Sequence, residues 1–258
     1  LVESGIAFEH LTRGYRSVIM TSATLTSGEN FSFLKNRLHI EDFGERIIGS
    51  PFDFRTQALL YIDRDLPKPD TENGGPFEKE SLKVIERLIE ASRGRALVLF
   101  TSYRNLDFVA ENLETLYPVK RQGEMPPAKL IKWFRDTPGS VLLATATFWQ
   151  GIDIKGDDLS LVIIVRLPFS SPGDPVYQER CNRLGGRWFH DLALPHATLS
   201  LRQGFGRLIR GRDEYGVVAI LDTRLVRSSY GRYIVSSLPP AGITHDIGDV
   251  EAFFTAHE

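Results

Sequence analysis

Short runs of apolar residues alternate along the chain with longer segments that have the periodicity of amphipathic helices. The apolar runs, which predict strands, lie at 17–20, 58–62, 96–101, 140–145, 161–165 and 216–221. Their nearly continuous apolar character is typical of strands that are buried on both faces of a parallel sheet. The pattern therefore predicts an α/β fold in which crossover helices cover both faces of a mainly parallel sheet.

The segments between these runs predict helices at 29–38, 77–92, 106–116, 128–135, 176–187 and 199–209. In the second of them, Leu82, Ile85, Leu88 and Ile89 recur at the spacing of one helix face. The stretch 66–77 is rich in Pro, Gly and Asn and predicts a surface loop. We expect residues 1–258 to form one compact domain.

Composition and charge exclude several classes of protein. The 258 residues are 42% hydrophobic and 25% charged, and no apolar run approaches the length of a membrane span. A single cysteine, Cys181, excludes an internal disulfide and a four-cysteine iron–sulfur site, and it fits a reducing cytoplasm. The formal net charge of −2 means that any phosphate-binding surface is local.

Because no initiator methionine precedes Leu1, we expect the chain to be a fragment of a longer protein.

Polar residues follow several of the predicted strands, at the edge where open α/β sheets place ligands. The first strand leads into TSATL at 21–25, whose small hydroxyl residues suit a phosphate or a neighbouring loop. The third strand leads into Thr101, Ser102, Tyr103 and Arg104 at an expected helix start, where backbone amides favour an anion and the tyrosine can stack on a base. The alternatives are an ordinary strand-to-helix turn and a plain capping turn.

The fourth strand opens into TATFWQGIDIKGDD at 145–158. Exposed aromatic residues between hydroxyl residues suit a nucleic-acid backbone, and Asp153, which follows a glycine, suits a ribose hydroxyl or a metal-bound water. The alternative is that the two aromatic residues of this stretch, at 148 and 149, simply pack in the core.

An arginine-rich segment, 202–224, is the strongest local concentration of charge. An apolar helix face made by Leu201, Phe205, Leu208 and Ile209 would leave Gln203, Arg207 and Arg210 to project elsewhere. Arg207 and Arg210 are three residues apart, so both guanidinium groups can reach the same phosphate oxygens. Gly206 leaves room for close approach. The alternative is a solvated basic face; we also expect Arg202 and Arg212 to be surface charge and Arg224 to form a structural ion pair.

In this order, TSATL, LFTSY, TATFWQGIDI and QGFGRLIR resemble motifs III, IV, V and VI of superfamily 2 helicases, and most resemble the DinG and XPD branch. The resemblance implies a RecA-like domain of the P-loop NTPase class, the second of two motor domains that bind ATP between them. It places the phosphate loop, the Asp-Glu-x-His sequence and most of the ATP and Mg²⁺ site in an amino-terminal motor domain joined in cis. It also implies a single-stranded DNA substrate, 5′ to 3′ translocation and a monomeric protein.

The resemblance also implies roles for single residues. Arg210 is expected to be an arginine finger on the γ-phosphate, with Arg207 beside it and Gln203 sensing the nucleotide. Gly151 and Asp153 are expected to line the nucleotide side of the cleft. The residues expected to face the single strand are Thr101, Ser102, Tyr103, Arg104, Thr145 and Thr147.

Two other functions remain open at this point. The domain could keep the fold without ATP coupling and serve as a single-strand or partner-binding module. It could also be an unrelated nucleotide-sugar enzyme with a similar sheet, although four motifs in order argue against that reading.

Overall fold

The structure is a computed structural model that describes residues 4–22, 25–26, 30–41, 43–69, 74–145, 148, 158–170, 173–209, 211 and 213–257, without the side chain of Arg207. The helices are α1 (Ser4–Thr12), α2 (Ser32–Leu38), α3 (Phe54–Gln57), α4 (Pro76–Ala91), α5 (Tyr103–Asn112), α6 (Pro127–Asp136), α7 (Pro175–Leu184), α8 (Leu194–Leu208), α9 (Arg224–Arg227), α10 (Gly231–Ser237) and α11 (Ile247–Ala256). A short 3₁₀ turn, η3 (Gly185–Arg187), and a π-helical turn, η4 (Phe189–Ala193), connect α7 to α8.

Seven parallel strands form one sheet. They are β1 (Ala58–Ile62), β2 (Ala96–Phe100), β3 (Val119–Arg121), β4 (Val141–Thr145), β5 (Leu161–Ile164), β6 (Gly216–Ile220) and β7 (Gly242–Thr244). The spatial order is β3-β4-β2-β5-β6-β1-β7, and every pair is parallel. The expected α/β fold with a mainly parallel sheet is confirmed.

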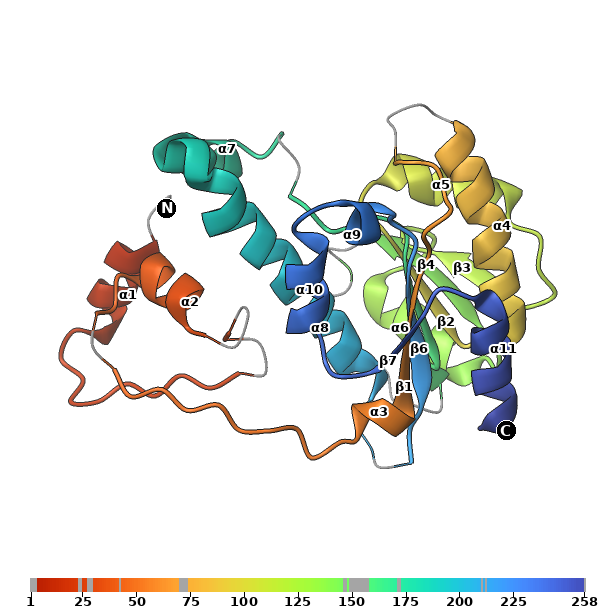
Figure 1. The fold of residues 1–258 in the computed structure, drawn as a ribbon, viewed down its shortest axis with the longest axis horizontal. Helices are drawn as coiled ribbons and strands as arrows, with labels where there is room; N and C mark the ends of the chain where they lie inside the picture. The colour runs from red at the N-terminus through yellow and green to blue at the C-terminus, as the bar shows by residue number, and fades with distance from the viewer. Residues whose placement is uncertain are drawn as a thin grey trace.

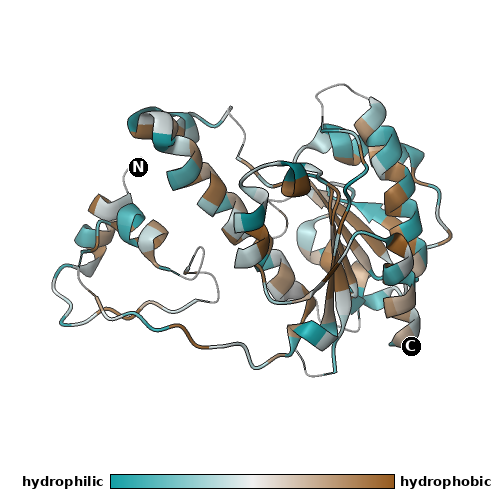
Figure 2. Cartoon of the chain, viewed as in Figure 1, coloured by the Kyte–Doolittle hydropathy of each residue, from teal (hydrophilic) through white to brown (hydrophobic). Residues whose placement is uncertain are grey.

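Helices cover both faces of this sheet, and two apolar cores result. Helices α4, α5 and α11 pack on one face through residues such as Phe77, Leu106 and Phe254. Helices α6, α8 and α10 pack on the other through residues such as Phe134 and Phe205 (Figure 1). Hydrophobic residues accordingly dominate the strands at the centre of the sheet (Figure 2). Because successive strand residues point to opposite faces, the apolar runs supply both cores at once.

Five of the six predicted strands occur within a residue of their expected bounds, as β1, β2, β4, β5 and β6. The edge strands β3 and β7 were not predicted. Each has three residues, β3 is only half-buried and β7 is mostly exposed, so neither carries an apolar run.

The predicted strand at 17–20 is wrong for this chain: all four residues are described and they form no strand. Ile19 is 90% exposed and Val18 is 47% exposed. The sequence has the right composition, but a strand also needs a neighbouring strand that bonds its backbone N–H and C=O groups. None of the described residues pairs with this segment.

All six predicted helices have a counterpart, with shifted ends. Helix α5 begins three residues early, at Tyr103, because the Ser102 side chain caps it. Helix α8 begins at Leu194 rather than 199 and follows directly on the π-helical turn. The predicted loop at 66–77 ends in α4, since Pro76 is compatible with a first helical turn; its residues 70–73 lie outside the described ones. Helices α1, α3, α9, α10 and α11 were not predicted.

The segment before the sheet, residues 4–53, is here called the N-terminal arm. It consists of α1, α2 and long extended connections, and its helices lie on the side of α7 and α8 away from the sheet (Figure 1). Helices α1 and α2 pack through Gly5 and His39: a Cβ at Gly5 would lie 2.5 Å from His39 Cγ, and the left-handed backbone of His39 (φ 55°) closes α2. Among the described residues, no helix combines the length and apolar character that a bilayer crossing requires.

Candidate functional site

The carboxyl ends of β2, β3 and β4 are joined by a chain of hydrogen bonds through Gln122. Its Nε2 donates to Tyr103 Oη at 2.8 Å. Its Oε1 accepts from the Thr145 backbone N at 2.8 Å and from Thr145 Oγ1 at 3.0 Å. Thr145 is buried, whereas Tyr103 is 54% exposed. The chain therefore anchors an aromatic ring on the surface, beside the edge where the strands end.

Sequence reasoning found Tyr103 and Thr145 but missed Gln122. The strand before Gln122 is too short to give an apolar signal, so nothing in the sequence set this glutamine apart. Only the pairing of β3 with β4 brings it between the other two side chains.

The neighbours of Tyr103 have mainly structural contacts. Ser102 Oγ accepts from the Asn105 backbone N at 3.4 Å, so the capping reading is right for this residue. Arg104 Nη2 lies 3.5 Å from Glu78 Oε1, which links α5 to α4. Thr101 is exposed at the end of β2.

A buried polar cluster lies just behind this turn. The Asn105 amide, with its orientation assigned from its partners, donates to Glu78 Oε1 at 2.6 Å and accepts from Arg166 Nε at 3.0 Å. Arg166, which follows β5, also places its guanidinium 4.7 Å from the centre of the Phe77 ring. The cluster fixes α4, α5 and the end of β5 relative to one another. Sequence reasoning missed Arg166, although an arginine directly after a buried strand is an available signal.

Asp222, at the end of β6, is fully buried, and both of its carboxylate oxygens accept hydrogen bonds. It accepts from the Leu167 backbone N at 2.8 Å and from Arg224 Nε at 2.9 and 3.1 Å. Hydrogen bonding to Asp222 raises the pKa of Arg224 despite partial burial. The structural ion pair expected of Arg224 is confirmed.

This carboxylate is therefore not free to bind a metal. No other group of three or more His, Cys, Asp or Glu residues within the described ranges could hold one. The described residues therefore do not fit a Mg²⁺ site.

Helix α8 carries the arginine-rich motif. Leu201, Phe205, Leu208 and Ile209 are all buried, so the predicted apolar face is confirmed. Gln203 is half-buried, and Gly206 is exposed. A Cβ added to Gly206 would meet no atom of a described residue within 4 Å.

Several predicted site residues cannot be placed. The side chain of Arg207 and the whole of Arg210, Gly151, Asp153 and Thr147 lie outside the described residues. Phe148 is described and packs in a core, as the alternative for that stretch proposed. The nucleotide roles of Arg207, Arg210, Gly151 and Asp153 and the strand-facing role of Thr147 stay predictions.

Arg202 corrects one expectation. It is half-buried, and its Nη1 donates to the Thr26 carbonyl at 2.8 Å and to Thr26 Oγ1 at 2.9 Å. Arg202 is therefore not surface charge. Its guanidinium links α8, which carries the arginine motif, to the N-terminal arm at the residue that follows TSATL. Arg212 lies outside the described residues.

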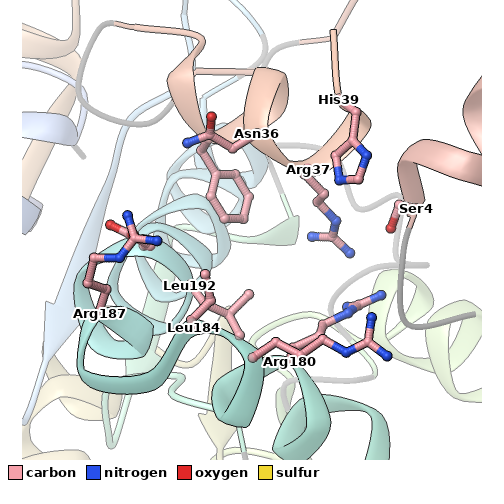
Figure 3. A pocket seen from close by; sticks show the side chains of 11 residues that line it. Ser4, Asn36, Arg37, His39, Arg180, Leu184, Arg187 and Leu192 are labelled. Atoms are coloured by element: carbon pink, nitrogen blue, oxygen red, sulfur yellow. The ribbon is translucent and has the colours of Figure 1, made fainter.

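A cavity of about 420 Å³ lies between α2 of the arm and the α7–η4 segment. Among the described residues, the charged side chains that line it are Arg37, Arg180, Arg183, Arg187 and Asp191. Arg37 and Arg180 extend into it from opposite walls, with His39 and Ser4 beside Arg37 (Figure 3). The pKa of Arg37 is lowered by partial burial and then by the charge of Arg180.

Comparison with known proteins gives a consistent result. Residues 85–241, more than half of the chain, match the helicase C-terminal domain family. The ATP-dependent DNA helicase YoaA of Escherichia coli is 40% identical over 92% of this chain and 38% of its own length. The 3'-5' exonuclease DinG of Bacillus subtilis is 36% identical over 88% of this chain and 26% of its own.

A solved XPD helicase structure has the same fold. It superposes with a TM-score of 0.72 over 94% of this chain and 45% of its own, at 18% identity. The chain thus spans well under half of the curated relatives that it matches. It belongs to the helicase C-terminal domain family, as a RecA-like domain of the DinG/XPD type in superfamily 2.

Proposed function

We propose that this chain is the second motor domain of an ATP-dependent DNA helicase and works with a first motor domain in cis. The observation that carries the proposal is the Tyr103–Gln122–Thr145 chain, which joins two of the helicase motif segments at one edge of the sheet. Relatives named as ATP-dependent DNA helicases support it.

The single strand is proposed to pass over this edge. The exposed ring of Tyr103 suits stacking on a base, since every base has a π-face, and Gln122 holds the tyrosine hydroxyl. Thr101, Ser102, Arg104, Thr145 and Thr147 are proposed to border the track. Thr145 would act on it indirectly, because its hydroxyl is already bonded to Gln122.

The ATP site is proposed to be shared between two domains. Arg210, with Arg207 and Gln203 on the same helical segment, would approach the phosphates from this side, and Gly151 and Asp153 would line the nucleotide. An arginine stabilises the negative charge that spreads over the transferring phosphoryl group. Closure on ATP and release after hydrolysis would move the strand track relative to the other domain.

The exposure of the apolar segment 17–20 supports the proposal that a second domain packs against it. Its strand-like residues lie in solvent in this chain, although a buried strand is what their pattern predicts. We propose that it joins a sheet supplied by the first motor domain, which would also hold Mg²⁺, and that the complete protein is monomeric.

The test of ATP coupling is Arg210→Ala in the longer protein. We expect the DNA-stimulated rate of ATP hydrolysis to fall by about 10³-fold or more, since arginine fingers contribute on that order. Arg232→Ala, an exposed arginine on α10, is the charge-matched control and should keep the rate. The 258-residue chain alone should hydrolyse little ATP.

An unchanged rate in the Arg210→Ala protein would favour the second candidate, a nucleic-acid or partner-binding module that keeps the fold without ATP coupling. Strong DNA-stimulated hydrolysis by the isolated chain would contradict the shared site itself.

The test of the strand track is Tyr103→Ala beside Tyr103→Phe. Loss of stacking should weaken single-strand binding by about 1–3 kcal/mol per base, whereas phenylalanine keeps the ring and loses only the Gln122 bond. Binding is read by fluorescence anisotropy of a labelled oligonucleotide. Tyr15→Ala, 73% exposed in the arm, is the aromatic control. Equal binding by Tyr103→Ala and wild type would remove this residue from the track.

A further inference from the structure

A group of aromatic rings, here called the aromatic cluster, lies where α7 turns into α8. Its members are Phe169, Trp188, Phe189, His190 and Tyr230. The ring centroid of Phe189 lies 5.8 Å from that of Phe169 and 5.1 Å from that of Tyr230. It also lies 5.7 Å from that of Trp188 and 5.4 Å from that of His190. The ring of Phe189 therefore joins the other four into one unit.

The aromatic cluster runs from the core to the surface. Phe169, Phe189 and Tyr230 are half-buried and pack against the apolar core on the α8 side of the sheet. Trp188, in contrast, is 41% exposed. Burying a large aromatic ring is favourable, and tryptophan is enriched where macromolecules bind. The indole of Trp188 is thus the part of the cluster that is accessible to a partner.

The backbone around Trp188 is a continuous series of helical turns. Gly185 ends α7 with a left-handed φ of 54°, and the 3₁₀ turn η3 follows it directly. The π-helical turn η4 then begins at Phe189, one residue after the tryptophan. Turns of this kind are rare and occur frequently at functional sites. Because Phe189 also contacts the indole edge to face, at an interplanar angle of 87°, the exposed ring has a support on its inner side.

The aromatic cluster lies at the same edge of the sheet as Tyr103. Tyr103 follows β2, Phe169 follows β5, and Tyr230 follows β6 and α9. The strands β2, β5 and β6 are neighbours in that order, and all are parallel, so their carboxyl ends share one edge (Figure 1). A nucleic-acid strand that crosses this edge from Tyr103 past the end of β5 would come to the aromatic cluster.

Two arginines border the aromatic cluster. The guanidinium of Arg224 lies 5.5 Å from the centre of the Phe169 ring. Arg187 directly precedes Trp188, and its side chain is 78% exposed. Its Nη1 lies 3.4 Å from Asp191 Oδ2, but such an exposed ion pair contributes little, so this guanidinium can exchange to a phosphate. Aromatic rings for the bases together with cations for the phosphates are typical of sites that bind single strands.

We propose that Trp188 stacks on a base of the single nucleic-acid strand and that Arg187 binds a neighbouring phosphate. This inference rests on the proposed function, because it takes the strand as substrate. Trp188 is a second stacking position along the edge, beyond Tyr103. The rings behind the indole restrict its motion before the strand arrives, which lowers the entropic cost of stacking.

The experiment measures the affinity of the 258-residue chain for two labelled probes by fluorescence anisotropy. One probe is an oligothymidine, and the other is an abasic strand of the same length, which keeps the sugar–phosphate backbone and has no bases. We expect Trp188→Leu to weaken oligothymidine binding by about tenfold, since stacking on one base contributes on that order. Binding of the abasic strand and the salt dependence of both affinities should stay as in wild type, because the phosphate contacts remain.

Three further variants keep the result interpretable. Trp188→Phe retains a ring and should weaken oligothymidine binding by less than about threefold. Arg187→Ala should weaken binding of both probes and lower the log–log salt slope by about 0.7, the value for one phosphate. Tyr15→Leu removes a 73% exposed ring from the N-terminal arm and should match wild type with both probes. The thermal unfolding midpoint of each variant shows that it has folded.

Unchanged oligothymidine binding by Trp188→Leu would overturn the inference and would leave the exposed indole to a protein partner. An equal loss with both probes would also overturn it, because Trp188 would then act through the structure of the turn. The Tyr103 variants and the Arg210→Ala hydrolysis assay do not involve Trp188, so the proposed function can stand while this inference fails. Failure of the wild-type chain to bind oligothymidine would instead overturn the proposed strand track together with this inference. The expected result is a loss confined to the probe that carries bases.

Discussion

Two regions of this molecule have similar apolar sequences and opposite outcomes. In the sheet, the run at 161–164 is fully buried as β5 between β2 and β6. In the N-terminal arm, the run at 17–20 has the same β-branched character, yet Ile19 is 90% exposed. The difference is the presence of neighbouring strands, because an apolar segment becomes a buried strand only where other strands bond its backbone.

The arm is nevertheless attached to the sheet domain by specific contacts. Arg202 reaches from α8 to Thr26, and α2 forms one wall of the arginine-lined cavity. The arm thus has specific contacts with this domain, whereas its apolar run at 17–20 pairs with no described strand. We interpret it as a segment that contacts two domains, of which one is in this chain.

The largest expected effect is a loss of unfolding free energy when a buried residue of the sheet domain is truncated, compared with truncation of an exposed residue of the arm. Phe134 on α6 is 1% exposed, so Phe134→Ala should lower the free energy of unfolding of this chain by about 3–5 kcal/mol. Ile19→Ala should change it by less than about 0.5 kcal/mol. Urea unfolding followed by circular dichroism measures both.

The same pair of variants sharpens the comparison in the longer protein. If 17–20 becomes a buried strand there, Ile19→Ala should cost about 2–5 kcal/mol in the first motor domain. An equally small loss of unfolding free energy from Ile19→Ala in both proteins would contradict the interpretation of the arm as a segment shared by two domains.

A smaller effect is expected for the link between the two regions. Arg202→Ala removes two charge-assisted hydrogen bonds to Thr26, which should cost about 1–3 kcal/mol of local stability. Faster amide hydrogen exchange in the arm, with little change in the sheet, is the expected readout. The control is Arg13→Ala, which removes only an exposed pair with Glu9 and should have almost no effect. Unchanged exchange in the arm would show that Arg202 does not hold it.

The smallest effect is a stabilisation. An added Cβ at Gly206 in α8 would meet no described atom within 4 Å, so Gly206→Ala should raise the unfolding free energy of this chain by about 0.5–1 kcal/mol through helix propensity. In the longer protein it should lower the rate of ATP hydrolysis if a second domain approaches this face closely. Gly231→Ala is the control of opposite sign, because its Cβ would lie 1.9 Å from the Leu225 carbonyl oxygen. A destabilised Gly206→Ala chain would contradict the open environment.

Much of the candidate site could be predicted because its signals are local. Tyr103 follows a long buried strand, and Leu201, Phe205 and Leu208 repeat at helical spacing, so both were identified from sequence. Gln122 could not be identified, since its strand has three half-buried residues and its role depends on Tyr103 and Thr145, which lie far from it in sequence. Arg202 was misinterpreted because nothing local distinguishes a solvated arginine from one that reaches Thr26.

The sequence by itself determined the α/β class, five central strands and the apolar face of α8, because periodicity and apolar runs report which side chains must leave water. Only the tertiary structure decided which of these runs had neighbours, which polar side chains met at the strand ends, and where the arm meets the sheet domain. Each of these features depends on two segments that are distant in sequence. Hydrogen bonds and ion pairs between such segments produce no periodic pattern in the sequence of either segment.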